Sequence, residues 1–209
     1  QQGASPPKQV DSSSGIKLLL IPAGTFMMGS PAGENDRDRD EILHQVTISK
    51  PFYMGRTEVT QGQWKKIMGT EPWKGQKYVQ EGDDYPAVYV NWHDAVAFCK
   101  MLSAHEGKTC RLPTEAEWED SCRGGTNTAF GFGDDAYDMH GNVFEWCSDW
   151  YGNYPSTPLT DPRGPDSGSF RVWRGGSWRG VPSFVRCANR DLNAPENRFN
   201  SNGFRLVLQ

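Results

Sequence analysis

The chain has 209 residues and a formal net charge of −4, with 36% hydrophobic residues, 12% aromatic residues, 23 Gly and 14 Pro. This length can bury a substantial core, and the composition favours a loop-rich globular protein over a helical bundle. No apolar run approaches the roughly 18 residues that a membrane span needs.

Charge is distributed unevenly along the chain. Residues 171–209 contain seven arginines, no lysine and two acids, which gives this segment +5 and leaves −9 for the remainder. A nucleic-acid surface usually mixes lysine with arginine on one face. Here the arginines are spaced through strand and turn phrases, which suits planar donors that bond carbonyls and carboxylates inside the fold. We therefore expect no nucleic-acid partner.

The first 14 residues, QQGASPPKQVDSSS, contain almost nothing to bury, which predicts a flexible leader over 1–14. A polar start of this kind remains when a secretory or lipoprotein signal and its anchoring cysteine are removed. This hypothesis predicts an extracellular or cell-surface protein whose only membrane contact is that removed lipid anchor. A precursor without an apolar segment upstream of Gln1 would contradict it.

Three strands are predicted over residues 16–22, 26–28 and 45–48. The charged run at 33–41, GENDRDRDE, does not have the spacing of an EF-hand, and its arginines oppose a bound cation. We expect this run to be a solvated loop.

Capping residues indicate three helices. Thr60 with Gln63 and Thr114 with Glu117 form capping boxes, and Asn91 precedes an amphipathic run. The buried face of the middle helix is expected to contain Trp92, Ala95, Val96, Cys99 and Leu102. Short aromatic strands and Gly/Pro turns follow residue 125, so we predict one α+β domain over 15–209, with an irregular antiparallel sheet formed late in the chain.

The five cysteines are an odd number, and no pair has the C-x-x-C spacing of a zinc or redox site. They are Cys99, Cys110, Cys122, Cys147 and Cys187. We expect most of them to be small buried hydrophobes, with at least one unpaired within the chain. One disulfide between two of these cysteines is an alternative that the sequence leaves open.

Seven phrases occur in a characteristic order: IPAGTFMMGS, PFYMGRTEVTQGQW, YPAVYVNWHDAVAFC, RLPTEAEWEDSCRGG, YDMHGNVFEWCSDWY, RVWRGGSW and NGFRLVL. In order and approximate spacing they resemble the formylglycine-generating enzyme family over about residues 16–208. The resemblance implies an α+β C-type lectin fold in its formylglycine-generating enzyme (sulfatase-modifying factor) variant, with irregular antiparallel sheets and few helices. That family includes oxidases, non-haem iron enzymes and non-catalytic binding proteins.

The residues on which catalysis would depend are missing. The family's oxidases carry a copper-binding cysteine pair shortly after the RGGS phrase, where this chain has Gly180 and Phe184. Cys187 lies beyond those positions and is expected to lack a partner thiol. The iron branch takes histidines from an additional helical domain, and none of the four histidines here has metal-like spacing. His140 is expected to make a structural hydrogen bond in its turn.

A calcium site is not expected either, because the connection between residues 125 and 137 is shorter than in the family's enzymes. Asp134, Asp135 and Glu145 would be the candidate ligands. We therefore predict no catalytic residues, no metal site and no cofactor.

The C-terminal segment resembles the variable protein of diversity-generating retroelements, which is one branch of this family. Four scaffold phrases carry the resemblance: RGGSW (174–178), RCANR (186–190), PENR (195–198) and GFR (203–205). Such elements mutate template adenines, so Asn codons become hypervariable. The residues between these phrases are among the amino acids that arise when the first two bases of an Asn codon are changed. Trp173 and Glu196 would need a different template codon.

The resemblance implies a non-catalytic ligand-binding protein that displays a hypervariable C-terminal surface, 171–209, to a protein or other surface macromolecule. We expect a monomer, although the sequence contains no signal for the oligomeric state. The predicted variable positions are Trp173, Arg179, Gly180, Val181, Ser183, Phe184, Asp191, Leu192, Glu196, Phe199 and Ser201. Three alternatives stay open. Phe184 and Phe199 could be core residues, the chain could be a formylglycine-generating or related oxidative enzyme with a degenerate or relocated metal site, or it could be a structural subunit of a secreted complex.

Overall fold

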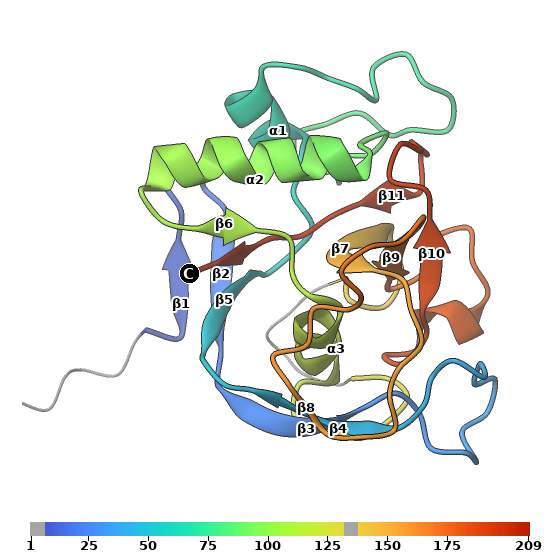
Figure 1. Cartoon of the computed structure of the whole chain (residues 1–209). Helices are drawn as coiled ribbons and strands as arrows, with labels where there is room; N and C mark the ends of the chain where they lie inside the picture. Colours follow the sequence, from blue (N-terminus) through green and yellow to red (C-terminus); the bar gives the residue numbers. More distant parts are fainter. Residues whose placement is uncertain (1–6, 132–137) are drawn as a thin grey trace, which may run out of the picture.

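The computed structural model describes residues 7–131 and 138–209 (Figure 1). The three predicted helices are confirmed as α1 (Gln61–Met68), α2 (Trp92–Glu106) and α3 (Glu115–Arg123). None of the helices in the described ranges is long and apolar enough to cross a membrane.

Each helix begins at the capping residue that the sequence indicated. The side chains of Thr60, Asn91 and Thr114 accept hydrogen bonds from the backbone N–H three positions on, and a left-handed glycine follows each last turn. The predicted face of α2 needs one change, because Phe98 is fully buried whereas Val96 is 37% exposed.

The first sheet has five antiparallel strands in the order β1-β2-β5-β12-β6. They are β1 (Gln9–Asp11), β2 (Lys17–Ile21), β5 (Phe52–Gly55), β12 (Val207–Leu208) and β6 (Cys110–Arg111). The last strand of the chain therefore lies inside this sheet, between two strands formed much earlier.

The prediction of a flexible leader over 1–14 is wrong for residues 9–14. Gln9–Asp11 pairs with β2, and the hydroxyl and N–H of Ser13 both donate to Glu106 at the end of α2. Backbone pairing, which does not require apolar side chains, holds this polar segment. Residues 1–6 lie outside the described ranges.

The other two sheets each contain one parallel pair, which the prediction of antiparallel sheets did not include. The four-stranded sheet has the order β10-β9-β7-β11, with β7 and β11 parallel, and the three-stranded sheet has the order β3-β4-β8, with β4 and β8 parallel. Their strands are β10 (Asp191–Asn193), β9 (Arg171–Arg174), β7 (Phe144–Trp150), β11 (Asn202–Gly203), β3 (Gly24–Met28), β4 (His44–Ile48) and β8 (Leu159–Thr160). A short 3-10 helix, η1 (Pro182–Val185), precedes β10.

Aromatic residues fill the core between these layers. Figure 1 shows α1 and α2 above the strands and α3 lower in the molecule, beneath β7 and β9. The Trp64 ring of α1 stacks on Phe98 of α2 with centroids 5.5 Å apart, and both rings contact Phe204 edge-on. Phe204 precedes β12, so the C-terminal segment is packed directly beneath the two helices.

The charged run at 33–41 is solvated, as predicted, over only part of its length. Residues 33, 35, 36, 38 and 39 are exposed. Glu41 is completely buried, however, and the Arg186 guanidinium donates to both of its carboxylate oxygens, at 2.6 and 2.8 Å. Arg186 also bonds Glu34 at 2.8 Å. Two acids of this loop are thus partners of a distant C-terminal arginine.

Candidate functional site

Buried arginines fix the backbone of the C-terminal segment. Arg174 lies on β9, is fully buried, and pairs with Glu119 of α3. Its guanidinium also donates to the carbonyls of Cys187, Ala188 and Asn189, at 2.7, 3.0 and 2.5 Å. One charged side chain therefore holds the RCANR phrase against the four-stranded sheet and the core helix.

Two further arginines repeat this arrangement. Arg190 donates to both oxygens of Glu115 at 2.7 and 2.8 Å, and Arg205 bonds both oxygens of Glu145 at 2.6 Å. Burial raises the pKa of Glu115, but the charges of Arg190 and Arg174 outweigh it and keep that pKa below its usual value of 4.5. The prediction that these arginines bond groups inside the fold is confirmed.

A glycine pair turns the chain after β9. Gly175 and Gly176 have φ angles of +90° and +72°, which side-chain-bearing residues rarely adopt. A Cβ atom on Gly176 would lie 2.7 Å from Val185 Cγ1 and 2.9 Å from the Phe184 carbonyl oxygen. The close packing of this turn on η1 therefore requires glycine at 176.

Exposure follows the division between scaffold phrases and predicted variable positions only in part, because Trp178 of RGGSW is 54% exposed. Residues 174–177, 186–190 and 203–205 are buried, whereas most of PENR is exposed, and Arg198 pairs with Asp94 at the surface. Six predicted variable positions are exposed: Arg179, Gly180, Val181, Phe184, Glu196 and Phe199. Four are half-buried: Ser183, Asp191, Leu192 and Ser201.

Trp173 is the exception among the eleven positions. Its side chain is 5% exposed, stacks on Phe144 with centroids 5.2 Å apart, and meets Trp146 edge-on at 4.9 Å. It therefore belongs to the core, and its assignment to the ligand-binding surface is wrong. The two phenylalanines behave differently, because Phe184 is 40% and Phe199 41% exposed. The alternative that they are core residues is not supported.

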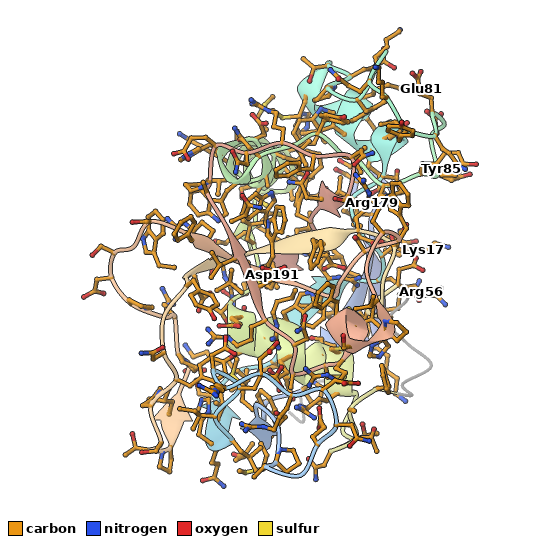
Figure 2. All side chains as sticks on the ribbon, turned by 90° about the vertical axis from the view of Figure 1, so that its right-hand side faces the viewer. Lys17, Arg56, Glu81, Tyr85, Arg179 and Asp191 are labelled. Atoms are coloured by element: carbon orange, nitrogen blue, oxygen red, sulfur yellow. The ribbon has the colours of Figure 1, made fainter. Side chains whose placement is uncertain are left out.

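Figure 2 faces the side of the molecule on which β10 lies in Figure 1, and it labels Arg179, Asp191 and Tyr85 there. Burial, aided by the charges of Asp38 and Asp40, raises the pKa of Asp191. This side of the molecule thus combines apolar, cationic and anionic groups, the mixture that macromolecular recognition uses.

A hollow with a volume of about 490 Å³ adjoins these positions. Its rim contains three aromatic side chains that the sequence analysis did not select: Tyr78 (80% exposed), Tyr85 (44%) and Trp178 (54%). Asn200 links Tyr78 with Trp178. The Asn200 side chain donates to the Tyr78 carbonyl at 3.3 Å, and the Asn200 carbonyl accepts from the Trp178 indole at 3.5 Å. In the sequence, the feature that could have indicated this rim is the pair of tyrosines in the polar run at 74–85.

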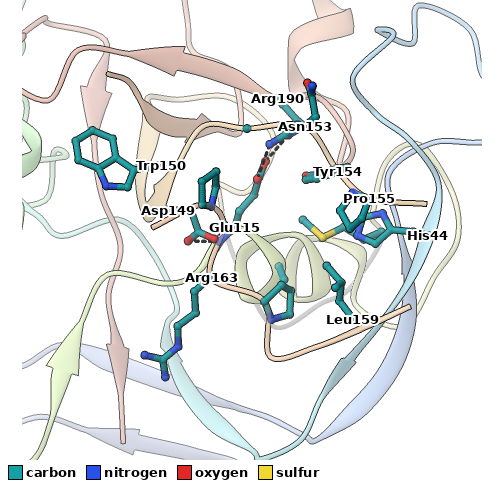
Figure 3. A pocket seen from close by; sticks show the side chains of 16 residues that line it. His44, Glu115, Asp149, Trp150, Asn153, Tyr154, Pro155, Leu159, Arg163 and Arg190 are labelled. Carbon is teal, nitrogen blue, oxygen red and sulfur yellow. Dashed lines mark hydrogen bonds and ion pairs between the residues drawn. The ribbon is translucent and has the colours of Figure 1, made fainter. Parts of the chain in front are cut away.

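A second hollow of about 390 Å³ lies at the start of α3 (Figure 3). Glu115, Arg190 and Asp149 line it together with Tyr154 and His44. Burial, followed by the charge of Glu115, raises the pKa of Asp149 to about 7. No predicted variable position lines either hollow. The chain neighbours of such positions are Trp178 and Asn200 in the first hollow and Arg190 in the second.

The structure gives Cys187 the partner that the sequence analysis did not find. Its Sγ lies 3.0 Å from Cys122 Sγ on α3, and His140 Nε2 lies 3.9 Å from Cys122 Sγ. His140 Nδ1 also bonds the Val185 carbonyl at 2.7 Å, as expected for a structural histidine in a turn. Of the candidate calcium ligands, Glu145 is paired with Arg205, and Asp134 and Asp135 lie outside the described residues.

Comparison with known proteins identifies the family. The profile of the sulfatase-modifying factor enzyme 1-like domain matches residues 3–136 and 132–209. The chain belongs to this family. Within the sulfatase-modifying factor family, it is 30% identical to the formylglycine-generating enzyme of Bos taurus, over 91% of this chain and 74% of the relative.

Two solved structures agree with the fold over almost their whole length. Variable protein 1 of Treponema denticola superimposes with a TM-score of 0.82 at 26% identity, covering 97% of this chain and 99% of its own. PvdO from Pseudomonas aeruginosa gives a TM-score of 0.85 at 28% identity, covering 99% and 100%. The predicted C-type lectin fold, in the variant typical of the sulfatase-modifying factor family, is confirmed. Because the similar proteins include both a named enzyme and a named variable protein, the comparisons alone do not decide the function.

Proposed function

We propose that this chain is a non-catalytic ligand-binding protein that displays variable side chains from its C-terminal segment on a lectin-type scaffold. The observation that carries the proposal is the burial pattern between residues 174 and 205. The scaffold arginines Arg174, Arg186, Arg190 and Arg205 are buried and bonded, whereas ten of the eleven predicted variable positions are exposed or half-buried. Side chains at such positions can change without disturbing the contacts that hold the backbone.

The chemistry of these positions fits a macromolecular ligand. Val181, Phe184 and Phe199 offer exposed apolar area, and Arg179 and Glu196 offer charge. The similarity to a protein named variable protein 1 supports the same function. We further propose a monomer located outside the cell or on its surface.

The structural experiment compares three alanine variants. Phe184→Ala and Phe199→Ala are expected to lower the free energy of unfolding by about 1 kcal/mol or less, as for surface substitutions. Trp173→Ala, the matched core control, is expected to lose about 3–5 kcal/mol. Urea unfolding measures all three. Losses at Phe184 and Phe199 equal to that at Trp173 would contradict a display role.

The binding experiment uses a displayed library. The ten exposed and half-buried variable positions are randomised, and the library is selected on immobilised lysozyme as a model protein. Binders that keep the parental melting temperature are expected. A library in which most members fail to fold, or which yields no binder although it folds, would overturn the proposal.

The enzyme alternative is supported by the 30% identity to a formylglycine-generating enzyme. It requires a redox metal site, and the positions of the oxidase cysteine pair are occupied by Gly180 and Phe184, both exposed. The chain, loaded with copper or iron, is incubated in air with a cysteine-containing peptide. Conversion of the cysteine to an aldehyde would establish catalysis and refute the non-catalytic proposal.

A further inference from the structure

A buried histidine lines the hollow at the start of α3. His44 is the first residue of β4, lies opposite Met28 of β3 and is 3% exposed. No residue in the described ranges bonds its Nε2 atom, although this atom is buried. Because buried polar atoms in folded proteins almost always have a hydrogen-bond partner, His44 marks this hollow as a place where a ligand can bind.

The other ring nitrogen of His44 decides the chemistry of such a ligand. The Nδ1 atom lies 2.8 Å from the Ile42 carbonyl oxygen. A carbonyl can only accept, so in the neutral ring the proton is on Nδ1 and the lone pair is on Nε2. The group that bonds Nε2 must therefore be an N–H or O–H donor.

The space beside His44 can hold an organic molecule. Its volume is about 390 Å³, and small-molecule pockets begin at about 300 Å³. The Tyr154 and His44 rings lie with their centroids 4.8 Å apart. The other rings and the branched apolar side chain of the lining are Trp150, Pro155, Leu159, Pro162 and Pro165 (Figure 3). Flat apolar faces of this kind make the most contact with a planar ring.

The charges in the hollow oppose an anionic ligand. Arg190, the buried guanidinium of the lining, already donates to both oxygens of Glu115. Asp149 is 3% exposed and accepts from the Glu115 N–H at 3.0 Å. Arg163 is exposed, and its side chain extends away from this group (Figure 3). A neutral ligand avoids repulsion from the two carboxyl groups.

We propose that this hollow binds a small neutral aromatic molecule whose N–H or O–H group donates to His44 Nε2. Indole and phenol have this chemistry. The apolar walls supply the affinity, and His44 selects molecules that carry a donor. No predicted variable position lines the hollow. The proposal is therefore independent of what the C-terminal surface binds, and either can fail without the other.

The first test compares two ligands that differ in the donor. The wild-type chain is titrated by calorimetry with indole and with benzofuran, which has nearly the same shape but a ring oxygen in place of the N–H. We expect one indole per chain, bound about 5–10-fold more tightly than benzofuran, which would leave Nε2 unsatisfied. Phenol repeats the titration with an O–H donor.

Two outcomes of these titrations would refute the proposal. The first is an absence of saturable binding for both indole and phenol, which would mean that the hollow holds only water. The second is equal affinity for indole and benzofuran, which would remove the role of His44.

Variants then locate the ligand. His44→Phe keeps a ring and removes the acceptor, so the preference for indole over benzofuran should disappear. His105→Phe is the matched control, because it changes an exposed histidine in the last turn of α2, and it should keep the preference. A preference that persists in His44→Phe would overturn the assignment.

A third variant leaves His44 in place. Leu159→Trp fills the hollow from β8 and should abolish indole binding, so it tests the location even if His44→Phe does not fold. NMR of protein labelled at histidine gives a direct readout, because indole should shift the Nε2 signal of His44 and leave that of His105 unchanged. A folded Leu159→Trp variant that binds indole as the wild type does would show that the ligand lies elsewhere.

Discussion

The carboxyl group of Glu58 lies in an environment that disfavours its ionised form. It is 3% exposed, and its Oε1 accepts from the Asn142 side chain at 3.1 Å. Burial, followed by repulsion from Glu145, raises its pKa to about 8, although the Arg205 charge acts in the opposite direction. The folded protein therefore holds a proton on Glu58 that the unfolded chain releases near pH 4.5.

This displacement predicts how stability depends on pH. Between about pH 4.5 and pH 8 the folded state binds more protons at Glu58 than the unfolded state, so its contribution to stability falls as pH rises, by about 1.4 kcal/mol for each unit of displacement. Glu58→Gln keeps the acceptor for Asn142 and cannot ionise. Urea unfolding from about pH 5 to about pH 8.5 should show a flatter profile for the variant and higher stability at the alkaline end. Identical profiles for variant and wild type would contradict the displaced pKa.

Individual residues also show what the sequence could not reveal. Trp173 and Trp178 occur in one phrase, yet the first is 5% and the second 54% exposed, because the left-handed glycine turn redirects the chain between them. The codon argument tests which residues are reachable by mutation and contains no information about burial. The meeting of Cys122 with Cys187 was equally invisible, since it depends on the tertiary position of α3.

Among the elements, those with local signals were predicted best. Capping boxes and terminal glycines lie within a few residues of each helix, so all three helices could be predicted from the sequence. The charged loop at 33–41 could be interpreted only in part, because its partner Arg186 lies some 145 residues later. Strands as short as β11 and β12 carry too few residues for periodicity to indicate them.

The turn between β9 and η1 provides a prediction at the scale of an element. Gly176→Ala places a Cβ 2.7 Å from Val185 Cγ1 at a φ of +72°, so we expect a loss of at least about 2 kcal/mol from strain and overpacking. Gly180→Ala is the matched control. Its Cβ would lie 3.2 Å from the flexible Phe184 ring and 3.3 Å from the Ser177 carbonyl oxygen. The loss in free energy of unfolding should therefore stay near about 0.5 kcal/mol or less. Differential scanning calorimetry compares the two. Equal losses would show that this turn does not distinguish scaffold from variable positions.

For the whole molecule, the order of the first sheet makes the C-terminus essential. β12 pairs with both β5 and β6, and Leu206, Val207 and Leu208 are buried. Deletion of residues 206–209 should remove more than about 5 kcal/mol, the whole stability of many domains. We expect no cooperative thermal transition and loss of near-ultraviolet circular dichroism. Gln209→Ala keeps the backbone pairing with Thr109 and should unfold as the wild type does; a cooperative transition in the deletion variant would contradict the central role of β12.

The overall architecture could be predicted because seven sequence phrases match those of a known family in order and approximate spacing. The proposed ligand-binding surface could be predicted only in part. The sequence separated scaffold phrases from the residues between them, but the contribution of Tyr78, Tyr85 and Trp178 to the adjoining hollow depends on packing between distant segments.

The position of β12 has a consequence for how errors in this chain are handled. The strand that closes the first sheet is made only after every codon of residues 171–205 has been translated in the correct frame. A nonsense or frameshift change anywhere in that stretch yields a polypeptide with a gap between β5 and β6. Such products would expose unpaired strand edges to proteases, so truncated copies should be degraded, whereas full-length copies keep the complete sheet.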